Sequence, residues 1–123
     1  MTYDPNNIFA KILRGEIPNQ TVVETEHSLA FRDINPARPT HVLVIPKGAY
    51  VTWDEFAANA SDAELTDFVR TIGVVARQEG VDHSGYRLIQ NNGTDGHQEV
   101  PHLHVHVVCL LYTSPSPRDG DES

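Results

Sequence analysis

The sequence is short of several features that mark large classes of protein. Among its 123 residues is one cysteine, Cys109, which excludes an internal disulfide and is consistent with a reducing compartment. Its 9 lysines and arginines face 17 aspartates and glutamates, and the net charge of −8 argues against binding nucleic acid through the phosphate backbone. No apolar run approaches the roughly 20 residues of a membrane helix, and the polar start of the chain lacks the pattern of a signal peptide. We therefore expect one soluble, cytoplasmic domain with neither nucleic acid nor a membrane as partner.

What the chain does have is histidine, with three of its seven in the segment 101–108. Side chains alternate between the two faces of a β-strand, so this segment predicts a strand with His102, His104 and His106 in a row on one face. The aliphatic residues between them would then point into a core. Imidazole is largely neutral at pH 7 and can act as nucleophile, acid or metal ligand. The row therefore predicts a functional site.

The rest of the pattern predicts an α+β fold with a five-stranded, mostly antiparallel sheet and two helices. Asn7 can cap a first helix over 8–14, and Ser61 with Glu64 has the spacing of a capping box before a second helix over 62–79. Four strands are expected besides the histidine strand, over 22–24, 29–33, 41–46 and 86–91. Residues 1–111 would form this one domain.

The segment 112–123 differs from the rest because it is rich in serine, proline and charge and has no apolar periodicity. Such a segment cannot bury enough surface to offset its ordering entropy. We expect it to be disordered, and its composition is also consistent with foreign sequence joined to the domain.

Two further features suggest phosphate chemistry. The loop 91–99 just before the triad offers backbone N–H groups, amides and glycines that allow close approach to a ligand. Asp33, at the end of an expected strand, can accept hydrogen bonds from two vicinal hydroxyls, as a ribose presents. The alternative for Asp33 is a turn residue that bonds its own backbone.

The pattern His-x-His-x-His followed by apolar residues resembles the signature of the histidine-triad (HIT) superfamily of nucleotidyl hydrolases and transferases. The resemblance covers about residues 4–108. Further segments are similar to the Hint-like branch of that superfamily: 8–12, 30–36, 39–41, 44–47 and 98–101. The family continues its triad with Gly-Gly-Arg, whereas this chain has Val-Cys-Leu-Leu over 108–111. This departure predicts a truncated domain before the tail.

The resemblance implies the HIT-like fold and hydrolysis of the P–N bond of purine nucleoside 5′-phosphoramidates, of the adenosine 5′-monophosphoramidase type. His104 would be the nucleophile that forms a covalent nucleotidyl-histidine intermediate. His106 would bind phosphoryl oxygens and help the leaving amine take its proton, His102 would orient the central ring, and His41 would complete the cluster. By the same likeness the enzyme needs neither a metal nor another cofactor and forms a homodimer through the second helix and the strand 86–91.

The resemblance also implies a substrate pocket. Asp33 would bind the ribose, and the base would lie among Ile8, Phe9 and Ile34. The predicted phosphate contacts are Asn91, Gln98 and the backbone of Glu99, which stands where some relatives carry a serine. From periodicity alone the three apolar residues also fit a core, and His41 also fits a residue that opens an apolar strand.

Two other functions fit the same residues. Histidines at alternate strand positions can bind zinc, although the outer pair would lie about 6.5–7 Å apart, so all three could ligate only with a distorted backbone. The chain could also be a nucleotide-binding interaction module with little turnover, because a complete triad does not identify the physiological substrate.

Overall fold

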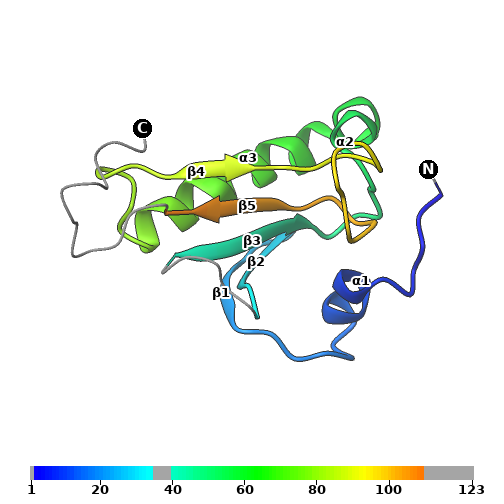
Figure 1. Cartoon of the computed structure of the whole chain (residues 1–123), viewed down its shortest axis with the longest axis horizontal. Helices are drawn as coiled ribbons and strands as arrows, with labels where there is room; N and C mark the ends of the chain where they lie inside the picture. The colour runs from blue at the N-terminus through cyan, green and yellow to red at the C-terminus, as the bar shows by residue number, and fades with distance from the viewer. Residues whose placement is uncertain (1, 35–39, 110–123) are drawn as a thin grey trace.

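The computed structural model describes residues 2–34 and 40–109 (Figure 1). The predicted tail over 112–123 lies outside these residues, as do the last two residues of the predicted domain. The sheet has the strand order β1-β2-β3-β5-β4, and every neighbouring pair is antiparallel. Its strands are β1 (Thr21–Glu24), β2 (Ser28–Arg32), β3 (His41–Pro46), β4 (Arg87–Ile89) and β5 (Val105–Val108). The predicted α+β fold with a five-stranded antiparallel sheet is confirmed.

The sheet is covered on both faces. The long helix α3 (Asp62–Gln78) runs along one face, and the short helix α1 (Ile8–Leu13) packs on the other (Figure 1). Strand β3 is central and, after His41, apolar on both faces, because Val42 and Val44 join the core under α3, whereas Leu43 and Ile45 join the core under α1.

The register of β3 with β5 shows which face of the sheet carries the histidines. Leu43 lies opposite His106, and paired residues of neighbouring strands share a face of the sheet. His106 therefore lies on the α1 side. The aliphatic residues that alternate with the histidines lie on the α3 side, where Leu103 and Val107 are fully buried and Val105 is nearly so. The predicted alternation of polar and core-facing residues is confirmed.

The predicted helix starts are also confirmed. Asn7 accepts from the N–H of Ala10 and begins α1. Ser61 accepts from the N–H of Glu64, whose carboxylate accepts from the N–H of Ser61, so both halves of the capping box are formed. Each helix ends one residue before the predicted bound.

Two expectations about the elements are corrected. A third helix, α2 (Trp53–Asn59), is present in addition to the two predicted helices. The histidine strand is also shorter than 101–108, since β5 begins at Val105. The ladder ends there because the N–H of Leu103 donates to the carbonyl of Tyr50, outside the sheet. Among the described residues, no helix is long and apolar enough to cross a membrane.

Candidate active site

His104 lies just before β5, almost fully buried, with one ring nitrogen engaged by backbone. Its Nδ1 lies 2.7 Å from the carbonyl oxygen of His102. A carbonyl can only accept, so Nδ1 carries the proton and donates. Burial lowers the pKa of His104 below its ordinary value, although the His102 carbonyl and the charge of Asp33 act in the opposite direction. The ring is therefore neutral at pH 7, and Nε2 holds an unprotonated lone pair.

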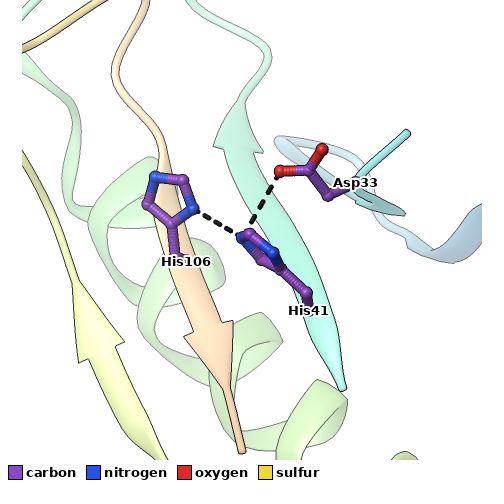
Figure 2. A group of neighbouring side chains, drawn as sticks. All are labelled: Asp33, His41 and His106. Carbon is purple, nitrogen blue, oxygen red and sulfur yellow. Dashed lines mark hydrogen bonds and ion pairs between the residues drawn. The ribbon is translucent and has the colours of Figure 1, made fainter. Parts of the chain in front are cut away.

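His106, His41 and Asp33 form a second group beside it (Figure 2). His41 at the start of β3 places its Nε2 2.9 Å from Nδ1 of His106 on β5 and 3.3 Å from Oδ2 of Asp33, which follows β2. Burial, with repulsion from His104 and His41, lowers the pKa of His106 to about 4. His106 is therefore neutral at pH 7 and carries a single ring proton.

The position of that proton follows from the carboxylate. Oδ2 of Asp33 lies 3.3 Å from Nε2 of His41, and a carboxylate favours an N–H beside it, so Nε2 of His41 carries the proton that it donates to Nδ1 of His106. Nδ1 of His106 is then the acceptor, and the single proton of this neutral ring sits on Nε2. The rings of His104 and His106 lie 5.2 Å apart between centroids. His104, with a free lone pair on Nε2, therefore lies beside His106, which has an N–H at Nε2.

His102 has a different environment from the other two histidines. It is completely buried, with Nε2 2.8 Å from the carbonyl oxygen of Pro46 and Nδ1 2.7 Å from the hydroxyl of Tyr3. Burial lowers its pKa to about 4. The three rings therefore do not form one uniform row. The His102 ring is enclosed, while the His102 carbonyl holds the central ring in place.

A cavity of about 530 Å³ opens beside His41 and Asp33. Its walls come from the end of α1, the segment before β1, and β2 with the residues after it. The lining residues are Ile12, Pro18, Asn19, Gln20, Phe31, Arg32, Asp33, Ile34 and His41. Two of the predicted nucleotide contacts, Asp33 and Ile34, lie in this wall.

The three residues predicted to contact the base differ in burial. Phe9 is buried in the α1 core and presents its ring to His104, with centroids 5.0 Å apart and planes at 76°. Ile8 is 40% exposed, and Ile34 is 72% exposed, so neither belongs to the core. From periodicity alone Ile8, Phe9 and Ile34 also fit a core. The structure places only Phe9 in the core, and its ring also walls the triad.

The loop 91–99 is held by one of its own predicted contact residues. The Gln98 side chain accepts from the N–H of Gly93 and donates to the carbonyls of Val51 and Val100. Its amide is thus occupied by backbone groups and shapes the loop from within. Asn91 is half-buried and Glu99 is exposed. Phosphate contacts from these residues stay predictions.

Sequence reasoning missed Tyr3, Asn19 and Gln20. The two amides lie in an irregular segment before β1, where no periodicity marks them. Tyr3 meets His102 from 99 positions away, and a contact so distant leaves no local pattern in the sequence.

One group in the described part of the chain could hold a metal ion. The ligand atoms of Asp33, His41 and His106 all lie within 4.8 Å of one another. The predicted zinc alternative used two or three of the triad histidines instead, and His102 is not available to it, because its two ring nitrogens are bonded to Tyr3 and Pro46.

Comparison with known proteins identifies the family. The model of the HIT domain matches residues 14–110. The chain belongs to the HIT domain family. An uncharacterized 13.2 kDa HIT-like protein of Azospirillum brasilense is 62% identical to it over 119 residues, which cover 97% of this chain and 98% of that protein. The predicted membership of the histidine-triad superfamily is confirmed.

Two further relatives of this HIT protein have names that point to different chemistry. The purine nucleoside phosphoramidase of Escherichia coli K12 is 42% identical over 101 residues, covering 82% of this chain and 84% of that enzyme. The 14 kDa zinc-binding protein of Zea mays is 43% identical over 106 residues, covering 85% of this chain and 82% of that protein. Among solved structures, a HIT family hydrolase from Clostridium thermocellum matches with a TM-score of 0.78 and 39% identity, covering 91% of this chain and 96% of that one.

Proposed function

We propose that this HIT protein hydrolyses the P–N bond of purine nucleoside 5′-phosphoramidates through a covalent intermediate on His104. The observation that carries the proposal is the pair of neutral imidazoles, His104 with a lone pair on Nε2 and His106 with a proton on Nε2. One can attack phosphorus while the other gives a proton to the leaving group. The identity to a named phosphoramidase supports the same substrate class.

In the first step Nε2 of His104 attacks the α-phosphorus and the P–N bond breaks. The electron pair of that bond leaves with the amine nitrogen, which takes the Nε2 proton of His106. The negative charge left on His106 is balanced by the positive charge that the His104 ring gains on bonding phosphorus, and N–H of His41 donates to Nδ1 of His106. Nδ1–H of His104 keeps its bond to the His102 carbonyl, so the ring does not rotate as its other nitrogen becomes bonded to phosphorus.

In the second step water attacks the phosphorus of the nucleotidyl-histidine. The water gives one proton to Nε2 of His106, and the P–N bond to His104 breaks with its electron pair returning to the ring. The products are a nucleoside 5′-monophosphate and the two histidines in their starting protonation states. Dividing the reaction in this way replaces one difficult displacement by two easier ones.

The cavity beside the histidines would hold the nucleoside. Asp33, half-buried at its edge, would accept from the ribose hydroxyls, and exposed Ile34 would lie against the base. Because Asp33 also bonds His41, a ribose on that carboxylate would contact the group that fixes the proton of His106.

The test is release of AMP from adenosine 5′-phosphoramidate. We expect steady turnover, and a single-turnover reaction quenched with denaturant at alkaline pH, where a P–N bond to histidine survives, should carry one adenylyl group on His104 by peptide mass spectrometry. Binding of AMP without turnover would instead assign the chain to the non-catalytic, nucleotide-binding class.

We also propose that the protein is a homodimer joined through α3 and β4. β4 lies at the edge of the sheet, where Leu88 is 49% exposed, and α3 presents Val69 at 63% exposed. An edge strand with apolar residues favours pairing with a second copy. Light scattering should give twice the chain mass of 13.7 kDa, and a monomer at micromolar concentration would contradict this assembly.

A zinc site is the second candidate, and it is favoured by the Asp33, His41 and His106 group. Tetrahedral zinc with ligands at about 2.1 Å sets neighbouring ligand atoms about 3.4 Å apart. His41 Nε2 lies 2.9 Å from one partner atom and 3.3 Å from the other. The name of the maize relative supports the same possibility. Zinc there would engage His106 and Asp33, so it would compete with the reaction above.

Chelation separates the two candidates. On the first proposal AMP release persists after dialysis against a chelator, and purified protein carries no stoichiometric zinc. Full loss of activity on chelation, restored by added zinc, would show that the activity depends on a metal site.

A further inference from the structure

Tyr3, far from the triad in sequence, forms a chain of contacts that ends at the proposed nucleophile. Its hydroxyl lies 2.7 Å from Nδ1 of His102, and the two rings meet edge to face with centroids 5.5 Å apart. Nε2 of the same histidine lies 2.8 Å from the carbonyl oxygen of Pro46. Both nitrogens of a completely buried ring are thus engaged.

The direction of each hydrogen bond is fixed. The carbonyl of Pro46 can only accept, so Nε2 of His102 carries the proton. A neutral imidazole has one N–H, which leaves Nδ1 as an acceptor. Tyr3 must therefore donate its O–H to Nδ1. Without this donor a buried acceptor would be left unsatisfied, which favours rotation or a change of tautomer.

The backbone of His102 transmits this restraint to His104. The carbonyl of His102 accepts from Nδ1–H of His104, and the N–H of the same peptide group, on Leu103, donates to the carbonyl of Tyr50. A peptide group is planar, so its carbonyl points in a direction set by these anchors and by the side chain on its α-carbon. A ring held at both nitrogens keeps that α-carbon in place.

Tyr3 is itself held by the start of α1. The carbonyl of Asp4 accepts from the backbone and the side-chain amide of Asn7, which caps the helix. Arg14 at the other end of α1 donates to the carbonyl of Pro5. The segment that carries Tyr3 is thus tied to the helix whose Phe9 ring contacts both His102 and His104.

We propose that Tyr3 is a positioning residue for His104: its hydroxyl fixes the tautomer and orientation of His102, whose carbonyl in turn holds His104 with Nε2 unprotonated. This inference rests on the proposed role of His104 as nucleophile. Tyr3 itself touches no reacting atom.

The test is Tyr3→Phe, which keeps the ring and removes only the hydroxyl. We expect kcat for adenosine 5′-phosphoramidate to fall about 3- to 10-fold, the size of one lost hydrogen bond, with KM within about twofold of wild type. Tyr86→Phe is the matched control, because Tyr86 is 42% exposed and belongs neither to the cavity lining nor to the hydrogen bonds of the histidines, and it should leave both constants unchanged. Melting temperatures of the variants show whether the loss comes from unfolding.

Nitrogen NMR of labelled protein supplies a readout independent of turnover. In the wild type we expect His102 protonated on Nε2 and His104 on Nδ1, and in Tyr3→Phe an increased share of His104 protonated on Nε2. A wild-type His102 protonated on Nδ1, or a variant with unchanged His104 signals and kcat within twofold, overturns the inference. If the wild type shows no turnover, the proposed function fails while the NMR comparison still decides the role of Tyr3.

Discussion

At the scale of single residues, one side-chain type serves three purposes here because its hydrogen-bond partners differ. A carbonyl partner puts the proton of His104 on Nδ1, whereas a donor from His41 puts that of His106 on Nε2. His102 is enclosed and bonded at both nitrogens. The backbone and neighbouring side chains, more than the spacing of the histidines, assign the chemical roles.

The clearest prediction at this scale is that His104→Ala abolishes turnover of adenosine 5′-phosphoramidate while AMP binding, measured by calorimetry, largely survives. Loss of a covalent nucleophile should lower kcat by several orders of magnitude. His83→Ala is the control, because that side chain is 97% exposed and should be dispensable. A His104→Ala variant with more than about a tenth of wild-type kcat would show that the nucleophile lies elsewhere.

At the scale of elements, strong periodicity and capping signals were enough to predict α1, α3 and the five strands. Helix α2 was missed because it is a short helix with one buried residue, Phe56, and its N-cap Thr52 makes no side-chain hydrogen bond. The start of β5 was misplaced because hydrogen bonding to Tyr50 outweighs the alternation that favoured a longer strand. Distant contacts of this kind leave no trace in local pattern.

The candidate site was likewise predictable only in part. The histidine spacing indicated the candidate site, and the family resemblance added Asp33 and His41, which the structure brings beside His106. The sequence could not show that the Gln98 amide bonds backbone groups or that Tyr3 contacts His102, since both depend on how separate segments pack.

The capping box of α3 gives a prediction at this scale. Ser61→Ala removes the acceptor for the N–H of Glu64, and the free energy of unfolding should fall by about 1 kcal/mol, with a melting temperature roughly 4 °C lower. Glu64 still accepts from the hydroxyl of Tyr50, so the start of the helix should survive. Thermal unfolding measures the loss of stability, with exposed Ser84→Ala as control. Equal losses of stability in both variants would show that the missing cap is not the cause.

At the scale of the whole molecule, the buried histidines link folding to pH. The pKa of His102 is about 4 in the folded protein but about 6.5 when unfolded, and that of His106 is lowered similarly. Between these values the unfolded state binds protons that the folded state does not, so stability rises with pH across this window and levels off above about 6.5.

We therefore expect the free energy of unfolding to be lower at pH 5 than at pH 7.5, by about 2 kcal/mol from His102 alone. Urea titrations at the two pH values measure the difference, which should shrink in His102→Gln. Equal stability at both pH values would mean that the histidines titrate normally in the folded protein.

The residues that contact one another in the site are far apart in sequence, and this affects when the site can form during translation. His102 bonds Pro46 across 56 positions, His41 bonds His106 across 65, and Tyr3 bonds His102 across 99. A ribosome releases the N-terminal part first, so Tyr3 and His41 emerge long before their partners exist. A nascent chain interrupted before His102 would carry one partner of each of these contacts and would lack His104, the proposed nucleophile. The proposed reactivity toward nucleotides would thus be absent until the segment that carries the three histidines has been translated.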